Sequence, residues 1–274
     1  MSGSTFFGPF SVLARLPDLR VEMELPFQGF SGAVYHRIVE RGGGDESWYL
    51  RQVPAAGRML DLCCGAGRHL RAFAQAGWSA TGVELAGSAL DRAYQLRAAL
   101  PAATAARIRL HRADARHASL GELVDCVLIG GLSFGLFGRS DRQALLRTAR
   151  SHLRPGGVLL LDFSPRQEQV DDQQDVVGVP LRGAAGTGFA WIGWRRSDQA
   201  GVQHTNIYGE LVRPPAPTRR YLSTVTMELI DEVELTTDLD GSGFRIADRS
   251  DRTIAAGAET MAMPVHMLAC EALR

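Results

Sequence analysis

Lysine is absent from the 274-residue sequence, so all 30 residues counted as Lys plus Arg are arginine. A chain without lysine cannot form a Schiff base with a carbonyl substrate or use a lysine as a base. The 30 basic residues balance 30 acidic ones, which gives a formal net charge of +0. Such a chain has no overall field that attracts nucleic acid or an anionic membrane, so a neutral or locally recognised substrate fits better.

Cysteine is scarce, and long apolar runs are missing. The four cysteines, Cys63, Cys64, Cys126 and Cys270, include no CxxC pair, and the adjacent residues 63 and 64 cannot easily bridge each other. We therefore expect reduced thiols, no metal site and a cytoplasmic protein. No stretch approaches the roughly 20 apolar residues of a membrane span, and residues 1–20 lack the pattern of a secretory signal.

Short apolar runs alternate with amphipathic helical patterns over residues 56–165. This alternation is typical of parallel βαβ units, and the nearly continuous apolar runs at 124–130 and 157–163 fit strands that are buried on both faces. Residues 1–55 mix short apolar clusters with breakers and are predicted to form an N-terminal cap. The sequence thus predicts an α/β core that follows a cap.

The pattern changes after this core. Residues 188–212 alternate around a polar turn as a β-hairpin would, and residues 218–230 fit another antiparallel strand. We predict an antiparallel β insertion over 166–222 and a C-terminal segment, 223–274, that completes the sheet.

Residues 59–70, MLDLCCGAGRHL, pass from a strand into a helix through a glycine-rich turn. Glycines at such a junction let the backbone approach a ligand, although tight packing alone also explains a single turn of this kind. A dinucleotide fingerprint would need a glycine three residues after Gly67, where Leu70 stands. Asp61 would repel a phosphate and attract an ammonium group, so a ligand without pyrophosphate fits better.

Three acids follow successive strands: Asp61 before the glycine turn, Glu84 at the end of the next strand, and Asp114 after the third. A carboxylate at Glu84 can accept both hydrogen bonds of a ribose diol, and Asp114 can accept from the amine of adenine. Each acid alone also fits an ordinary role, such as a solvated strand end or a helix cap. Together, beside the glycine turn, they indicate a site for a nucleoside.

These residues resemble the class I S-adenosylmethionine-dependent methyltransferases over residues 57–165. LDLCCGAGR is similar to their first motif, L-D-x-G-C-G-x-G, with Cys63 in place of the first glycine, a change we expect to be tolerated at a negative φ. GVEL resembles their ribose-binding acid, ADA their adenine-side motif, and LRPGGVLLLDF the piece that ends in their fifth strand. The resemblance implies a Rossmann-like, doubly wound sheet of seven mostly parallel strands with an antiparallel last strand over 265–273, and an insertion that acts as substrate lid.

The resemblance also implies S-adenosylmethionine as cofactor and S-adenosylhomocysteine as product. Asp61 would face the methionine amino group, Glu84 the ribose hydroxyls and Leu85 the adenine. The other cofactor contacts implied are the backbone of Cys63, Gly65 and Gly67, Asp114 and Ala115 beside the base, and Ile129 and Gly130 beside the methionyl part.

The segment GAVYHRIV resembles the N-terminal tyrosine segment of glycine N-methyltransferase and of sugar-amine dimethyltransferases, which implies that Tyr35 contacts the cofactor near its methyl or carboxylate end. A core tyrosine explains the position almost equally well. AVYHRI and ESWYL also resemble methyltransferases that dimethylate the N-terminus of daptide-type peptides. We therefore expect N-methylation of an amine on a small-molecule or peptide natural product, with an O-methyltransferase of secondary metabolism as the alternative.

Methyl transfer from a sulfonium needs alignment above all, and a base matters more for a hydroxyl than for an amine. Side chains that could take part in catalysis are Tyr35, His204 and Tyr208, followed by His36 and Ser133. Trp191 and Trp194 on the insertion fit either a lid or a core.

Other classes of function fit less well. GGLSF follows the fourth strand in place of the N/D-P-P-Y/F loop for flipped-out bases, which disfavours nucleic-acid methylation. Leu70 and Asp61 disfavour a nicotinamide oxidoreductase, and a non-catalytic S-adenosylmethionine-binding or scaffold protein stays open. The expected partner is a small-molecule or peptide acceptor, not nucleic acid or a membrane, and a homodimer is left open.

Overall fold

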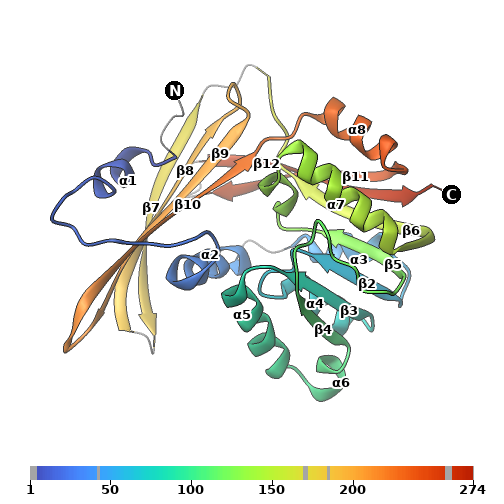
Figure 1. Cartoon of the computed structure of the whole chain (residues 1–274), viewed down its shortest axis with the longest axis horizontal. Helices are drawn as coiled ribbons and strands as arrows, with labels where there is room; N and C mark the ends of the chain where they lie inside the picture. The colour runs from blue at the N-terminus through green and yellow to red at the C-terminus, as the bar shows by residue number, and fades with distance from the viewer. Residues whose placement is uncertain (1–4, 42–43, 169–171, 184–185, 257–260, 274) are drawn as a thin grey trace. The chain divides into compact units, whose positions relative to one another are not determined.

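The computed structural model describes residues 5–41, 44–168, 172–183, 186–256 and 261–273. The chain forms two compact units, each with its own sheet (Figure 1). The seven-stranded unit comprises Val39–Pro165, Ile230–Arg252 and Pro264–Arg274. The five-stranded unit comprises Met1–Ile38, Arg166–Leu229 and Thr253–Met263.

The seven-stranded sheet has the strand order β11-β12-β6-β5-β2-β3-β4. Its strands are β2 (Arg58–Leu62), β3 (Ser79–Glu84), β4 (Ile108–Arg112), β5 (Val124–Ile129), β6 (Leu153–Phe163), β11 (Phe244–Ala256) and β12 (Met261–Ala272). β2 pairs in parallel with both β3 and β5, so that Asp61 stands opposite Gly82 and Leu128. The chain builds outward in opposite directions from β2 and β5, and ligands of open α/β sheets bind at the carboxyl ends of the strands at such a switch point.

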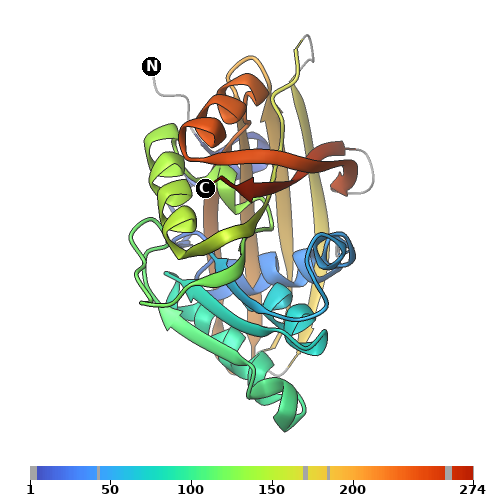
Figure 2. The same ribbon diagram turned by 90° about the vertical axis from the view of Figure 1, so that its right-hand side faces the viewer.

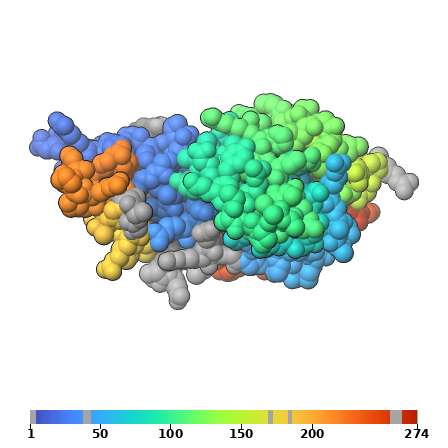
Figure 3. Space-filling view, turned by 90° about the horizontal axis from the view of Figure 1, so that it is seen from below, coloured from blue at the N-terminus to red at the C-terminus, as the bar shows by residue number. Residues whose placement is uncertain are grey.

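Helices cover this sheet, and their buried stripes follow the helical period. They are α3 (Glu46–Arg51), α4 (Arg68–Gln75), α5 (Gly87–Ala98), α6 (Ala102–Ala105), the 3-10 turn η1 (Ser133–Leu136), α7 (Arg139–His152) and α8 (Glu232–Gly241). α7 and α8 lie side by side (Figures 1 and 2), joined by ion pairs from Arg139 to Asp238 and from Arg142 to Glu234. The teal surface in the space-filling view belongs to the stretch of chain that contains α5 and α6 (Figure 3).

The last strand of the chain runs against its neighbour. β12 pairs antiparallel with β6, and β11 follows β12 at the edge of the sheet. The predicted α/β fold, with a mostly parallel seven-stranded sheet and an antiparallel last strand, is therefore confirmed.

The five-stranded sheet has the order β1-β10-β9-β8-β7. Its strands are β1 (Glu22–Met23), β7 (Gln173–Gly183), β8 (Gly186–Ser197), β9 (Val202–Arg213) and β10 (Ala216–Glu228). The predicted hairpin corresponds to β8 and β9, and the predicted strand that follows it is β10. The apolar pattern does not predict β7, because Gly178 and Pro180 interrupt it; β7 lies at the edge of the sheet, where proline is tolerated.

Two helices pack on opposite faces of this sheet, α1 (Gly8–Leu13) and α2 (Gly29–Arg41). Phe10 of α1 packs with Tyr208. Val34 of α2 packs with Ile207. Because neighbouring residues of a strand point to opposite faces, Ile207 and Tyr208 separate an α2 face from an α1 face.

The two compact units divide the chain at other positions than the segments named in the sequence analysis. Residues 39–55 of the predicted N-terminal cap belong to the seven-stranded unit, and residues 253–263 near the tips of β11 and β12 belong to the five-stranded unit. Of the helices in the described ranges, none combines the length and the apolar character that crossing a membrane requires.

Candidate functional site

The turn after β2 contains three residues with left-handed backbone: φ is 70° at Cys63, 55° at Gly65 and 86° at Gly67. The negative φ under which a cysteine would be tolerated in place of the first glycine is not found at Cys63. The N–H groups of Cys63 and Cys64 both donate to the carbonyl oxygen of Val83, at 2.9 and 3.0 Å, and this shared acceptor bends the chain into the left-handed region. A side chain in that region costs about 1–2 kcal/mol that a glycine would not.

The two glycines of the turn have different surroundings. A Cβ on Gly65 would meet no atom within 4 Å, so its backbone faces open space. Gly67 precedes α4 as its N-cap, and its carbonyl oxygen accepts a hydrogen bond from the N–H of Arg71 at 3.0 Å. The backbone of Gly65 is therefore open to close approach, while Gly67 starts the helix.

α4 packs closely against β3 at Gly82, which has no side chain. A Cβ on Gly82 would lie 2.6 Å from both Cδ1 of Leu70 and Sγ of Cys64. A dinucleotide fingerprint obtains this close approach from a third glycine on the helix, whereas here the glycine lies on the strand. The sequence analysis misses Gly82, although a glycine inside a strand pattern is a recognised signal of close approach.

Asp61 lies near the carboxyl end of β2 and is 1% exposed. Neither of its carboxylate oxygens has a hydrogen-bond partner among the described residues. Its Oδ2 lies 3.7 Å from Nδ1 of His69. Burying a carboxylate without hydrogen bonds is costly, so Asp61 is a buried acceptor whose capacity the described residues leave unused.

Glu84 ends β3 and reaches back to the glycine turn. Its carboxylate accepts hydrogen bonds from the N–H of Gly65 at 2.9 Å and of Ala86 at 2.7 Å. Burial raises the pKa of Glu84, and these two N–H groups counteract the rise. The next side chain, Leu85, is 60% exposed, so an apolar surface stands beside a hydrogen-bond acceptor.

Asp114 lies beyond the end of β4 and is held by a neighbour. Nη2 and Nε of Arg116 contact Oδ2 and Oδ1 of Asp114 at 2.6 and 3.0 Å. The hydrogen bond from Arg116 lowers the pKa of Asp114, which favours the charged carboxylate. Ala115 beside it is 5% exposed and belongs to the core, so it offers little surface to a ligand.

β5 ends at Ile129, whose side chain is fully buried in the core, so only its backbone can border a ligand. Gly130 follows, and a Cβ there would lie 2.7 Å from Cε1 of His69. The missing side chain of Gly130 thus makes room for the His69 ring.

Asp162 of β6 fixes the turn that follows Gly130. It accepts hydrogen bonds from the N–H groups of Gly131 and Leu132, at 3.0 and 2.6 Å, and both residues have positive φ, 68° and 61°. Tyr49 of α3 donates its hydroxyl to the same carboxylate at 2.7 Å. The turn after β5 is therefore tied to both α3 and β6.

The three predicted acids all raise the pKa of one side chain, the thiol of Cys63. Burial raises the pKa of the Cys63 thiol, and the carboxylates of Glu84, Asp61 and Asp114 raise it further. β2, β3 and β4 are neighbours in the sheet, and Asp61, Glu84 and Asp114 lie near or just beyond their carboxyl ends. The three acids therefore stand at adjacent strand ends.

The sequence analysis misses a buried group of charges beside these acids. His69 of α4 lies with Nε2 3.2 Å from Oδ2 of Asp45, and Arg68 grips the same carboxylate through both terminal nitrogens. The adjacent basic pair in GAGRHL and the acidic residues in DESWY are the signals that point to it. In the ranges that the structure describes, no three His, Cys, Asp or Glu side chains gather so as to hold a metal ion.

Tyr35, His204 and Tyr208 belong to the five-stranded unit, and the structure does not bring them together there. Tyr35 packs on the α2 face with the cluster that contains Ile207. Tyr208 packs on the α1 face and donates its hydroxyl to Glu210 at 2.5 Å. His204 shares that face by strand alternation, and its Nδ1 lies 2.9 Å from Oγ1 of Thr226.

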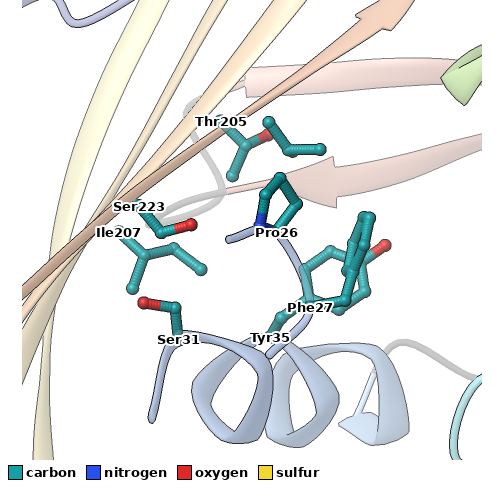
Figure 4. Close-up of a pocket in the computed structure, with 8 residues that line it drawn as sticks. Pro26, Phe27, Ser31, Tyr35, Thr205, Ile207 and Ser223 are labelled. Atoms are coloured by element: carbon teal, nitrogen blue, oxygen red, sulfur yellow. The ribbon is translucent and has the colours of Figure 1, made fainter. Parts of the chain in front are cut away.

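A small pocket of the five-stranded unit lies on the α2 face. Its walls come from the segment before α2, from α2 and from β9 and β10, as Figure 4 shows for Pro26, Phe27, Ser31, Tyr35, Thr205, Ile207 and Ser223. The hydroxyl of Ser31 is buried and has no hydrogen-bond partner within the described part of the chain. The space, about 10 Å³, suits a single water molecule rather than a substrate.

The remaining candidates lie on α2, at the start of η1 and on β8. His36 follows Tyr35 on α2, and Ser133 begins η1. Trp191 is 37% exposed and packs against Phe189 and Tyr208, whereas Trp194 packs with the cluster on the α2 face. The two tryptophans therefore serve different faces of the sheet.

Two curated proteins resemble part of this chain. The dTDP-3-amino-3,4,6-trideoxy-alpha-D-glucopyranose N,N-dimethyltransferase of Streptomyces venezuelae is 32% identical over 112 residues, 40% of this chain and 44% of that protein. The dTDP-3-amino-3,6-dideoxy-alpha-D-glucopyranose N,N-dimethyltransferase of Streptomyces fradiae is 34% identical over 113 residues, 41% of each. The matching stretch therefore spans less than half the length of either relative.

Solved structures resemble the chain over most of its length. The sugar N-methyltransferase KedS8 from Streptoalloteichus sp matches with a TM-score of 0.67 and 19% identity over 90% of this chain and 94% of that one. The amino pentose methyltransferase CalS10 from Micromonospora echinaspora matches with a TM-score of 0.61 and 23% identity over 87% of this chain and 96% of that one.

Residues 59–157 match the family described as Methyltransferase domain. This stretch contains the glycine turn and the strands that carry Asp61, Glu84 and Ile129. Residues 59–157 therefore resemble a methyltransferase domain, and the chain has the fold of S-adenosylmethionine-dependent methyltransferases.

Proposed function

We propose that this chain is an S-adenosylmethionine-dependent methyltransferase that methylates the nitrogen of an amine on a small molecule or a peptide. The observation that carries the proposal is the buried carboxylate of Asp61, which has no hydrogen-bond partner among the described residues and lies beside an open glycine turn. A cationic amino acid tail attached to a nucleoside is the kind of ligand that suits this pairing of groups.

The residues present fit this cofactor. Asp61 would bind its ammonium group, and Glu84, at the end of β3, would accept hydrogen bonds from its ribose. Leu85 offers an exposed apolar surface to the adenine, and the backbone at Gly65 is open to close approach. Asp114, which Arg116 already holds, would contribute to the adenine side with its remaining acceptor capacity.

When bound, S-adenosylmethionine supplies a methyl group that its positively charged sulfur has already activated. The contribution of the chain is then to hold cofactor and acceptor in line, which can provide about 7–11 kcal/mol in well-oriented systems. An uncharged amine has a free lone pair and needs no base during attack, whereas a hydroxyl must lose its proton.

Nitrogen is favoured over oxygen by two observations. Both curated relatives are named as N,N-dimethyltransferases of amino sugars. Of the predicted base candidates, Tyr208 is held by Glu210, and His204 is held by Thr226 on the face opposite Tyr35. We therefore keep Tyr35 as the proposed cofactor and acceptor contact.

The four free cysteines support a reducing, cytoplasmic location.

The test combines binding with turnover. Isothermal titration with S-adenosylhomocysteine and with NAD should detect only the first, and D61N should weaken its binding about 10- to 100-fold, the loss expected for a hydrogen bond between charged groups. S-adenosylhomocysteine release should then appear with amino sugars or peptide amines.

Three outcomes would contradict the proposal. Binding of NAD alone would indicate an oxidoreductase. Turnover with hydroxyl acceptors and none with amines would indicate an O-methyltransferase. Tight cofactor binding without turnover on any amine or hydroxyl of the panel would indicate a binding or scaffold protein.

A further inference from the structure

The imidazole of His69 lies between two buried carboxylates. Its Nε2 is 3.2 Å from Oδ2 of Asp45, and its Nδ1 is 3.7 Å from Oδ2 of Asp61. The ring itself is buried, with 6% of the residue exposed. Because a carboxylate can only accept, both ring nitrogens must carry protons for His69 to interact favourably with both acids.

The ring is held in this position by its neighbours. Cε1 and Nδ1 of His69 lie against Gly130, where a Cβ would come within 2.7 and 3.1 Å of them. The ring of Tyr49 meets the imidazole edge to face, with centroids 5.6 Å apart and an angle of 83°. The His69 ring is therefore packed between the backbone that follows β5 and Tyr49 of α3.

The titratable and charged groups around His69 come from four elements and one loop. Asp45 lies just before α3 and Tyr49 on it, Asp61 lies on β2, Arg68 on α4 itself, and Asp162 on β6. Burial lowers the pKa of His69, but the carboxylates of Asp45 and Asp61 outweigh it and raise the pKa to about 9. His69 is therefore an imidazolium at neutral pH.

The other acids of the group have their own donors. Arg68 binds Asp45 through both terminal nitrogens and also contacts Glu46 at 2.7 Å. Asp162 accepts from the Tyr49 hydroxyl and two backbone N–H groups. Asp61 has none of these partners in the described ranges, so the His69 imidazolium is the positive group that faces it.

We propose that His69 is a positioning residue of the cofactor site: it faces one oxygen of Asp61 from inside the protein and leaves the other for the ammonium group of the cofactor. This inference rests on the proposed function. The imidazolium fixes the orientation of the Asp61 carboxylate and stabilises its negative charge before the ligand binds. Pre-organised partners lose less freedom when the ligand arrives.

The experiment uses two ligands that differ in the group Asp61 recognises. S-adenosylhomocysteine carries the ammonium group, and 5′-methylthioadenosine has the same nucleoside without the amino acid tail. H69Q should weaken binding of S-adenosylhomocysteine about 10- to 100-fold and change that of 5′-methylthioadenosine by less than about twofold. In a D61N background, H69Q should have no further effect on S-adenosylhomocysteine.

H152Q is the matched control, because His152 is also a buried helix histidine of the same unit, 5% exposed and hydrogen-bonded to the carbonyl of Thr148 at 2.8 Å. H152Q should leave the affinity ratio of the two ligands unchanged. Equal losses for both ligands in H69Q, or no loss for either, would overturn the inference while the proposed function stands. A wild-type chain that binds neither ligand would overturn both.

A second measurement does not depend on a folded H69Q variant. Nitrogen NMR of ¹⁵N-histidine-labelled wild-type protein at pH 7.5, with the His69 ring assigned by through-bond correlation to its own backbone, should show both ring nitrogens protonated, with and without S-adenosylhomocysteine. A neutral ring in the free protein would contradict the inference, even if H69Q failed to fold.

Discussion

Leu70 on α4 packs directly over Gly82 of β3: a Cβ added to Gly82 would lie only 2.6 Å from Cδ1 of Leu70. Leu70 and Cys64, the other neighbour, are 1% and 6% exposed, so neither can move aside freely. G82A should therefore destabilise the protein by about 1–3 kcal/mol in urea unfolding, the usual cost of overpacking. G241A at the end of α8 is the control, because a Cβ there meets nothing within 4 Å and its cost should be near zero. Equal stability of the two variants would refute the close contact.

The protein should be more stable with glycine than with alanine at position 63. Its φ of 70° lies in the region that side chains avoid. The free energy of unfolding of C63G should exceed that of C63A by about 1 kcal/mol, because both variants lose the sulfur but only glycine relieves the backbone. Unfolding in urea measures the difference. An alanine variant at least as stable as the glycine variant would mean that the strain is not there.

Glu84 should affect both ligands of the site, in contrast to His69. It caps the glycine turn through Gly65 and is the proposed ribose contact. E84Q should weaken S-adenosylhomocysteine and 5′-methylthioadenosine alike, by about 10- to 100-fold, because both carry the ribose. Calorimetric titration of both ligands compares the losses. A loss confined to S-adenosylhomocysteine would place Glu84 at the amino acid tail instead.

The stability of the protein should depend on pH through His69. Its pKa is about 9 in the fold and 6.5 ordinarily, so its contribution is complete below about pH 6.5 and is lost as pH rises through 9. The difference corresponds to about 3 kcal/mol, as an order of magnitude. Urea unfolding from pH 6 to 10 should show this decline in wild type and in H152Q, and a flatter profile in H69Q. The same slope in H69Q would assign the decline to other groups.

Substitutions of Tyr35 and Tyr208 should affect activity differently, because the two side chains lie on opposite faces of the five-stranded sheet. Y208F loses the hydrogen bond to Glu210 and should cost about 1 kcal/mol of stability. Y35F should lower kcat about tenfold, more than Y208F does, if Tyr35 contacts the cofactor or the acceptor. Steady-state release of S-adenosylhomocysteine decides, and a larger loss in Y208F would move the catalytic group to the α1 face.

Local patterns account for most of the fold. β5 and β6 carry nearly continuous apolar runs, and the helices between the strands have an amphipathic period, so these patterns predict the parallel strands. The antiparallel last strand is predicted by the family resemblance instead. The sequence does not predict β7, because Gly178 and Pro180 interrupt its alternation of apolar and polar residues. The positive φ at Cys63 could not be predicted from local pattern, since it accompanies two hydrogen bonds to one carbonyl of β3.

The parts of the site that the sequence does not predict depend on residues far apart in the chain. Asp45 and His69 are 24 positions apart, and Tyr49 and Asp162 are 113 apart. No periodicity connects such pairs; only the packing of α3 and α4 against the sheet brings them together. Strand alternation separates His204 and Tyr208 from Thr205 and Ile207, but it does not reveal which of the two faces α2 covers.

The carboxylate of Asp162 fills a concavity that resembles the anion-binding nests of other proteins. Two successive N–H groups, from Gly131 and Leu132, converge on it from a left-handed turn, a geometry that binds phosphates and other anions elsewhere. Because an internal acid already occupies this nest, its two N–H groups are not available to an external anion. The turn after β5 thus carries its own counter-anion, and a phosphate of any ligand would need a different set of donors.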